Sequence, residues 1–172
     1  TSALGNSYEG YFSDGRLNGP GSFRSYLGET YVGDWLGGRM HGQGLYVFAN
    51  GSRYEGTWIN DKRTGQGIYH YANGSVYEGN FYDGKRNGLG KYENINGDIY
   101  DGDWKNNMMD GKGIYFFING DVYIGDWYND MRHGEGTFSF SKGKKYKGSF
   151  LQNKIMGKGT MSTSDGKTFT GN

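Results

Sequence analysis

Histidines and aspartates are the side chains of this 172-residue chain that could do acid–base or metal chemistry. Two of the three histidines, His41 and His133, hold the same place in an internal repeat of 23 residues, four repeats apart. With two β-strands per repeat at ~4.8 Å per strand, they would lie roughly 40 Å apart, too far to share a metal ion within one chain. We therefore expect both imidazoles to pack beside neighbouring loop residues. A zinc ion that bridges two chains through them is the alternative.

Five aspartates in the second half of the chain could form a ladder across neighbouring hairpins: Asp98, Asp101, Asp103, Asp121 and Asp126. Their spacing differs from that of a calcium-binding loop, so we expect them to face water. The chain has no cysteine, which excludes zinc–thiolate sites, iron–sulfur clusters and cysteine nucleophiles. Serine, histidine and carboxylate residues do not form a recognisable nucleophile motif. We predict a protein that is not an enzyme and that uses no cofactor and no metal.

Glycine and aromatic residues carry the regular pattern of the sequence. There are 34 glycines, and aromatic residues make up 17% of the chain although the mean hydropathy is only −0.84. A disordered chain of such low hydropathy would have few aromatic residues. Here an aromatic residue recurs every 23 residues without insertion or deletion, at Tyr8, Tyr31, Tyr54, Tyr77, Tyr100, Tyr123, Tyr146 and Phe169. This fixed period indicates a repeat protein.

Each repeat predicts a β-hairpin. In residues 54–58, Tyr-Glu-Gly-Thr-Trp, alternation places both rings and the glycine on one face of a strand. A second strand follows at Tyr69-His70-Tyr71, and Asn73-Gly74 then predicts a tight turn in which both residues tolerate positive φ. The first loop holds Gly, Asp or Asn at one position of every repeat, the types that adopt left-handed conformations most readily. We expect a ring from a neighbouring strand to cover the glycine between the two aromatic residues.

The repeats predict an all-β fold, an elongated single-sheet array of seven antiparallel hairpins and the start of an eighth. Residues 1–172 form one domain in this prediction, with repeats that start at 8, 31, 54, 77, 100, 123 and 146. A partial repeat starts at 169, and residues 1–7 form a partial N-terminal cap. At about 10 Å per repeat the array would be a rod of roughly 70 Å.

The order Tyr-Glu-Gly-x-Trp, short loop, His-Gly-x-Gly, second aromatic strand and Asn-Gly resembles the MORN repeat (membrane occupation and recognition nexus). Residues 31–35 with 39–44, and residues 123–127 with 131–136, match well, and the resemblance covers essentially the whole chain. The first and seventh repeats depart from it, for example at Pro20 and Met161. The resemblance implies binding rather than catalysis. Members of the family serve as scaffolds in cytoskeletal and ciliary assemblies, as dimerisation elements and as accessory modules of lipid kinases and methyltransferases, and an affinity for phosphoinositides has been proposed for them.

Aromatic side chains form the first candidate interaction surface. They exceed what one thin sheet can bury, and a contiguous exposed strip of rings would mark a protein interface. The alternative is that the rings stack on one another as the core. We predict a groove for a helical or extended peptide of a partner protein, formed by Trp35, Phe48, Trp58, Tyr71, Trp104, Phe117, Trp127 and Phe140. An apolar column on the opposite face could dock a helix instead: Leu36, Ile59, Tyr82, Tyr128 and Leu151.

Charge is unevenly distributed, although the net charge of +1 argues against a general nucleic-acid binder. Residues 93–135 hold three basic and nine acidic residues, whereas residues 136–172 hold seven basic residues and one acidic residue. The basic end predicts, as an alternative, binding to anionic membrane lipid through Lys142, Lys144, Lys145, Lys147 and Lys154. The two blocks of opposite charge also predict an antiparallel homodimer that high salt weakens.

These features predict a cytoplasmic scaffold or adaptor, associated with the cytoskeleton or a membrane, that displays a β-sheet groove to a partner in a cytoskeletal or ciliary assembly. A phosphoinositide-binding module is the first alternative. A regulatory segment of a larger enzyme is the second.

Overall fold

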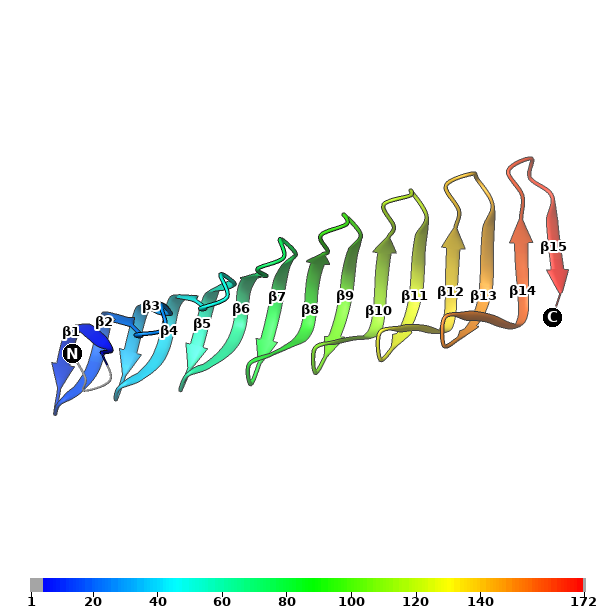
Figure 1. Ribbon diagram of the computed structural model, residues 1–172. Helices are drawn as coiled ribbons and strands as arrows, with labels where there is room; N and C mark the ends of the chain where they lie inside the picture. The colour runs from blue at the N-terminus through cyan, green and yellow to red at the C-terminus, as the bar shows by residue number, and fades with distance from the viewer. Residues whose placement is uncertain (1–4, 172) are drawn as a thin grey trace. The chain divides into compact units, whose positions relative to one another are not determined.

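The computed structural model describes residues 5–171, and every regular element in this range is a β-strand (Figure 1). The chain divides into two compact units, with the boundary between Lys85 and Arg86. Residues 1–4 of the predicted cap and Asn172 of the predicted eighth repeat lie outside the described residues. Between residues 5 and 171 there is no helix of the length and apolarity that a bilayer crossing requires.

The strands of each unit are antiparallel, and their order in the sheet follows their order in the chain. The first unit contains β1 (Ser7–Ser13), β2 (Arg16–Arg24), β3 (Thr30–Leu36), β4 (Arg39–Val47), β5 (Arg53–Ile59), β6 (Lys62–His70) and β7 (Val76–Tyr82). The second contains all of β8 (Lys85–Glu93) except Lys85, together with β9 (Ile99–Lys105), β10 (Met108–Phe116), β11 (Val122–Tyr128), β12 (Met131–Ser139), β13 (Lys145–Leu151), β14 (Lys154–Ser162) and β15 (Thr168–Gly171). The predicted all-β fold of antiparallel hairpin repeats is confirmed.

The turn inside each hairpin consists of two residues with positive φ. Asn106 and Asn107 have φ of 51° and 74°, and Asn129 and Asp130 have 48° and 64°. Two consecutive left-handed residues are typical of the type I′ turn, whose twist matches that of the flanking strands. The predicted left-handed position in the first loop is therefore confirmed.

The turn between repeats differs from the prediction. At Asn73-Gly74 only the glycine has positive φ, 93°. The Gly74 N–H donates to the carbonyl of Tyr71 over 3.0 Å, and the Asn73 side chain accepts from the Ser75 N–H over 3.0 Å. The asparagine thus acts through its side chain, as in an Asx turn, rather than through a left-handed backbone.

Glycines pair with glycines across neighbouring strands. In the second unit Gly102 lies opposite Gly113, which in turn lies opposite Gly125. The ring of Tyr100 lies over this pair, because a Cβ added to Gly102 or Gly113 would come within 2.7 Å or less of the ring or hydroxyl. A ring covers Gly102 as predicted, but the prediction that it comes from a neighbouring strand is wrong, because Tyr100 belongs to the same strand. The reason is that a tyrosine two residues earlier on the same face can lean along the bare backbone.

Candidate functional site

The core consists of tyrosines that lie between rings of two successive repeats. Tyr100 is 1% exposed, and its ring centroid lies 5.2 Å from that of Trp104 and 5.3 Å from that of Trp127. Both pairs are edge-to-face, the geometry that aromatic rings prefer. In the first unit Tyr54 lies in the same way between Trp58 and Phe81, at 5.1 and 5.0 Å.

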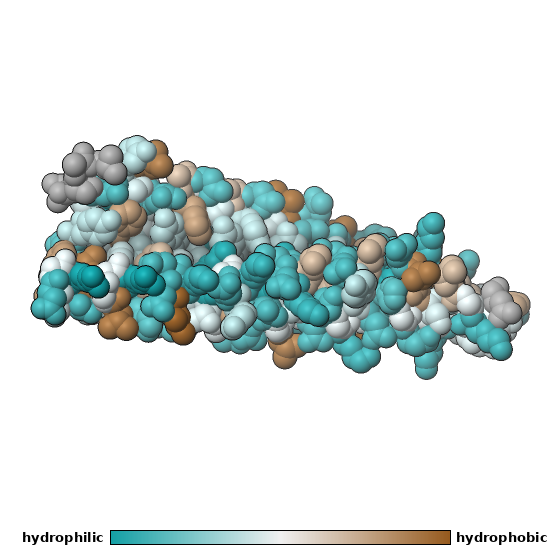
Figure 2. Space-filling view, turned by 90° about the horizontal axis from the view of Figure 1, so that it is seen from below, coloured by the Kyte–Doolittle hydropathy of each residue, from teal (hydrophilic) through white to brown (hydrophobic). Residues whose placement is uncertain are grey.

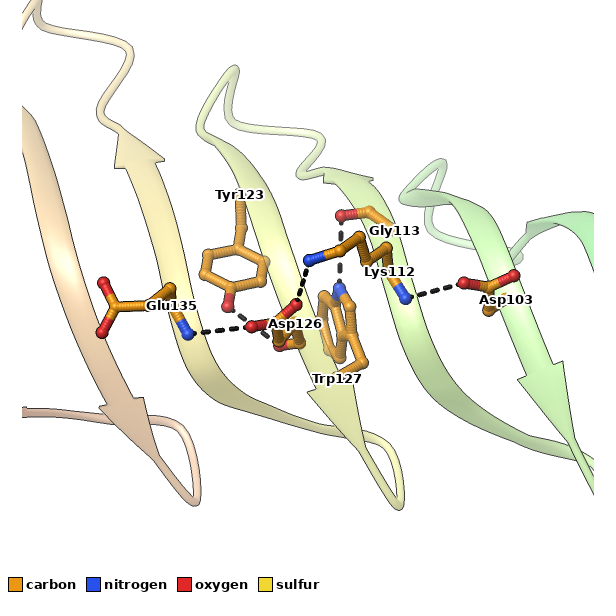
Figure 3. Close-up of polar contacts among 7 residues, drawn as sticks. All are labelled: Asp103, Lys112, Gly113, Tyr123, Asp126, Trp127 and Glu135. Carbon is orange, nitrogen blue, oxygen red and sulfur yellow. Dashed lines mark hydrogen bonds and ion pairs between the residues drawn. The ribbon is translucent and has the colours of Figure 1, made fainter.

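The hydroxyl group of each of these tyrosines donates a hydrogen bond to a backbone carbonyl of its own strand. Tyr123 donates to the carbonyl of Asp126 over 2.9 Å (Figure 3). Tyr100 donates to the carbonyl of Asp103 over the same distance. Burial raises the pKa of Tyr54 and Tyr123 to about 12, because a charged phenolate would lose its hydration there. The rings are therefore neutral donors at neutral pH.

The four tryptophans predicted as partner contacts are buried. Trp35, Trp58, Trp104 and Trp127 are between 4% and 7% exposed. The indole N–H of Trp127 donates to the carbonyl of Gly113 in the preceding hairpin over 3.4 Å (Figure 3). The indole N–H of Trp104 donates to the carbonyl of Gly90 over 2.9 Å. The indole rings therefore lie in the core and leave little surface that a partner could contact.

The other four predicted contacts are half-buried and extend a continuous row of rings. In the second unit the centroids are 4.5 Å apart for Tyr115 and Phe117, 5.6 Å for Phe117 and Phe138, and 4.7 Å for Phe138 and Phe140. We call each such row a ring ladder. The ladder of the first unit contains Tyr46, Phe48, Tyr69 and Tyr71, with successive distances of 4.6, 5.7 and 4.6 Å.

A column of arginine, methionine, leucine and isoleucine residues, not predicted from the sequence, borders the rings. It stands nine residues after the tyrosine of each repeat and contains Leu17, Met40, Arg63, Arg86, Met109, Arg132 and Ile155. The Arg132 guanidinium lies 5.1 Å from the ring centroid of Phe138 and 5.7 Å from that of Phe150. Its Nη2 also donates to the carbonyl of Asn153 in the next hairpin over 3.0 Å. Long side chains of this kind cover apolar surface with their stems while their polar ends stay hydrated.

Three hollows open beside these rings. In the first unit one is lined by residues that include Tyr8, Trp35 and Met40, and another by residues that include Phe48, Lys62 and Arg63. The largest of the three, about 450 Å³, is in the second unit and adjoins Phe138 and Phe140. The predicted rings Phe48 and Phe140 are thus placed at concave surface, where a partner side chain could be held.

The expectation that the five aspartates face water is wrong for four of them, which accept hydrogen bonds from the backbone, whereas Asp101 is exposed. Oδ2 of Asp103 accepts from the Lys112 N–H over 2.8 Å, and Oδ2 of Asp126 accepts from the Glu135 N–H over 3.0 Å (Figure 3). These bonds satisfy the backbone where the register shifts after Met109 and between Gly125 and Asp126. Asp98 and Asp121 accept from backbone N–H groups of the next turn, those of Ile118 and Ser141, each over 2.8 Å.

The histidines are not brought together at a site. His133 packs on Tyr128, with centroids 5.6 Å apart, and the Nδ1 of His41 is buried without a hydrogen-bond partner. Within residues 5–171 no group of three or more His, Asp or Glu side chains could hold a metal ion.

The predicted lipid contacts are exposed. Lys142, Lys144, Lys145, Lys147 and Lys154 are all exposed, and Lys154 adjoins the hollow of the second unit.

The apolar column of the opposite face is exposed as well, at 54% for Leu36, 68% for Tyr82 and 43% for Leu151. Figure 2 shows hydrophobic residues on the visible face as separate patches among hydrophilic ones, rather than as one broad apolar surface.

Comparison with known proteins gives the following matches. The model of a family described as MORN repeat matches residues 8–26, 31–53, 54–76, 77–99, 100–122, 123–145 and 146–168. No curated protein matches the sequence. Among solved structures, the chain is similar to the TCP domain of Drosophila melanogaster SAS-4 (dCPAP) in complex with a Proline Rich Motif of Ana2 (dSTIL), at 16% identity and a TM-score of 0.58, over 100% of this chain and 93% of that chain.

Two further structures are similar. The TCP10c domain of Drosophila melanogaster Sas-4 is 15% identical, with a TM-score of 0.50 over 90% of this chain and 93% of that chain. The G-box domain of the microcephaly protein CPAP is 13% identical, with a TM-score of 0.50 over 98% and 99%. At these identities the similarity shows the fold alone.

Proposed function

The chain belongs to the MORN-repeat family, and we propose that it is a non-enzymatic scaffold that binds a partner protein through its ring ladders. The observation that carries the proposal is the half-buried state of Phe48, Tyr71, Phe117 and Phe140, which stand on a fixed layer of buried rings. Rigid aromatic rings that are only partly covered are typical contacts of protein interfaces.

The mechanism is the display of a preorganised surface. The tyrosine and tryptophan layer beneath the ladders is locked by edge-to-face contacts and by hydrogen bonds to backbone carbonyls. A partner that covers such a surface loses little of its binding free energy to rearrangement of the scaffold. The structurally similar SAS-4 domain was solved in complex with a peptide motif, which supports a peptide of a partner protein as the ligand. We further propose a cytoplasmic location in a cytoskeletal or ciliary assembly.

Affinity capture with matched variants tests this function. The full chain is used as bait in an extract rich in cytoskeletal proteins, and each captured protein is purified and tested for direct binding. The double variant Phe117→Ala/Phe140→Ala should lose the partner. The control Asp101→Ala/Ile124→Ala alters exposed residues that alternate with the core side chains of β9 and β11, and it should retain the partner. Equal loss of the partner in both variants would contradict the proposal.

Membrane binding is a second candidate, favoured by the exposure of Lys142, Lys144, Lys145 and Lys147 in one short segment. Each lysine near an anionic leaflet contributes about 1 kcal/mol. Flotation with phosphoinositide vesicles at physiological salt, abolished by Lys→Glu changes at these positions, would favour this candidate. Absence of flotation would favour the protein scaffold over membrane binding.

Two other proposals concern the context of the chain. An antiparallel homodimer would pair the acidic residues 93–135 with the basic residues 136–172 of a second copy, and sedimentation as a monomer at low salt would exclude it. The chain could also regulate an enzyme as a segment of a larger protein, a role that its direct partners would identify.

A further inference from the structure

The hollow beside the ring ladder of the second unit is apolar at its base and cationic at its edge. It is lined by Arg132, Phe138, Phe140, Phe150, Asn153, Lys154 and Ile155. Phe138 and Phe150 are buried, Phe140 is half-buried, and Lys154 is exposed. A hollow of about 450 Å³ with this lining fits one or two apolar side chains of an extended ligand.

Charge around the hollow favours an acidic ligand. Arg132 and Lys154 belong to its lining, and the described residues that line it include no Asp or Glu. Lys142 and Lys144, in the turn that follows Phe140, and Lys145, the first residue of β13, are exposed and add positive charge nearby. Such a field attracts carboxylates and holds them by charge complementarity.

The spacing of the rings matches one type of backbone. Phe117 and Phe140 hold the same position in successive repeats, and Phe138 joins them into one ladder. Two strands at ~4.8 Å give about 9.6 Å per repeat. A polyproline II helix rises ~3.1 Å per residue and repeats every three residues, or about every 9.3 Å. An α-helix would present equivalent side chains every seven residues, or about every 10.5 Å, which fits the repeat less closely.

Hydrogen-bond donors at the edge of the hollow favour the same backbone. An α-helix satisfies its own carbonyl groups, whereas a polyproline II segment leaves them without internal partners. The side chains of Arg132, Asn153 and Lys154 all carry N–H donors and adjoin the hollow. An extended ligand could therefore bond through its backbone here.

We propose, on the basis of the protein-binding function above, that the ring ladder of the second unit binds an acidic, proline-rich segment in the polyproline II conformation. Prolines one turn apart pack on Phe117 and Phe140. A carboxylate of the segment faces Lys154 and Arg132. Aromatic grooves suit such segments, because the ligand is already extended and loses little conformational entropy on binding.

Fluorescence anisotropy with the full chain tests the proposal. The probe is a labelled peptide of four Pro-Pro-Glu triplets. One comparison peptide has four Gly-Ser-Glu triplets, with the same charge on a flexible backbone. The other is a helix-forming peptide of Ala, Leu and four Glu. We expect the proline-rich peptide to bind with a Kd at least about tenfold lower than either comparison peptide.

Three variants locate the binding. Phe140→Ala and Lys154→Glu should each raise the Kd at least about fivefold. Lys158→Glu makes the same charge change in the same strand, but Lys158 is not among the residues that line the hollow. It should change the Kd less than about twofold. Circular dichroism checks the fold of each variant, and the exposed Lys154 carries the test if Phe140→Ala unfolds.

The other outcomes separate this inference from the proposed function. Tighter binding of the helical peptide, with the same dependence on Phe140, would overturn the polyproline inference and leave the scaffold function standing. Equal binding of the Pro-Pro-Glu and Gly-Ser-Glu peptides, or equal effects of Lys154→Glu and Lys158→Glu, would indicate general charge attraction and overturn the inference. The inference would also be overturned if the chain bound none of the three peptides while it still captured its partner through Phe117 and Phe140.

Discussion

The ring of Tyr100 lies directly against Gly113 of the neighbouring strand, where it fills the space that a Cβ atom would need. The same relationship links Tyr54 to Gly67 and Tyr123 to Gly136. The ring row that supports the candidate face therefore depends on glycines whose missing side chains let the tyrosines lie flat along the sheet.

Gly113→Ala should destabilise the protein. Its Cβ would lie 2.5 Å from Cζ of Tyr100, and this ring is buried and held from both sides by tryptophans. We expect the free energy of unfolding to fall by about 1–3 kcal/mol, the usual cost of overpacking a core. Urea unfolding monitored by tryptophan fluorescence measures it. Gly171→Ala is the control, because a Cβ there meets nothing within 4 Å, and an equal loss in the control would contradict the account.

Alkaline pH should unfold the protein through its buried tyrosines. Burial raises the pKa of Tyr46, Tyr54, Tyr115 and Tyr123 to about 12, whereas an unfolded tyrosine titrates near 10. The folded state thus keeps protons that the unfolded state loses, so this stability is complete below about pH 10 and falls between about pH 10 and 12.

Absorbance of tyrosinate near 295 nm follows this titration. We expect the buried tyrosines to ionise only above about pH 10, together with unfolding, whereas in denaturant the absorbance should rise near pH 10. A titration of the native protein that coincides with the titration in denaturant would show that these rings are accessible.

Asp126 should matter for its backbone hydrogen bond more than for its ion pair. Its Oδ2 accepts from the Glu135 N–H over 3.0 Å, and its Oδ1 lies 2.7 Å from Nζ of the exposed Lys112 (Figure 3). We expect Asp126→Ala to lower the free energy of unfolding by about 1 kcal/mol. Lys112→Ala should leave it nearly unchanged, because exposed ion pairs contribute little. The reverse order in urea unfolding would contradict this assignment.

The same carboxylate should contribute to stability at neutral pH. The hydrogen bonds that Asp126 accepts from the Lys112 side chain and from the Glu135 N–H lower its pKa below the ordinary value, against a rise from burial. The contribution is therefore present above the unfolded pKa near 4 and disappears as the pH falls below it. The difference in stability between the native chain and Asp126→Ala should shrink in acid.

Arg132 should tolerate methionine better than alanine. Met40 and Met109 stand at the same position of other repeats, so the site accepts a long unbranched side chain. Arg132→Met keeps the packing on Phe138 and Phe150 and loses the cation–π contacts, for a cost of about 0.5–1 kcal/mol. Arg132→Ala also uncovers the rings and should cost more. Thermal unfolding compares the two, and an equal cost would mean that the stem does not pack.

The sequence was sufficient for the hairpins and for one of the two turn types. The tyrosine period fixed the repeats, and the Gly, Asp or Asn column located the left-handed turns, as at Asn107 and Asp130. The position of the Asn-Gly turn was predicted correctly, but its conformation was not, because Asn73 acts through its side-chain oxygen. Local composition does not distinguish these two uses of asparagine.

The candidate face was predicted in part. The sequence placed the tryptophans and the ring ladders on one face. It did not show that tyrosines of the preceding repeat and of the same repeat bury the indoles, as Tyr100 and Tyr123 do at Trp127. The column of arginine, methionine, leucine and isoleucine residues was missed because its members differ in charge and in residue type. Alignment of the repeats nine residues after each tyrosine would have revealed it.

The most direct test of the central claim is photo-crosslinking. The full chain carries p-benzoylphenylalanine in place of Phe117 or Phe140, or in place of the exposed Asp101 of β9, which alternates with Tyr100 and Gly102. After irradiation in a cytoskeletal extract, the account predicts a discrete protein adduct from the two ring positions and none from position 101. Adducts of equal yield from all three positions, or none from the ring positions, would contradict the claim that the ring ladder is the binding face.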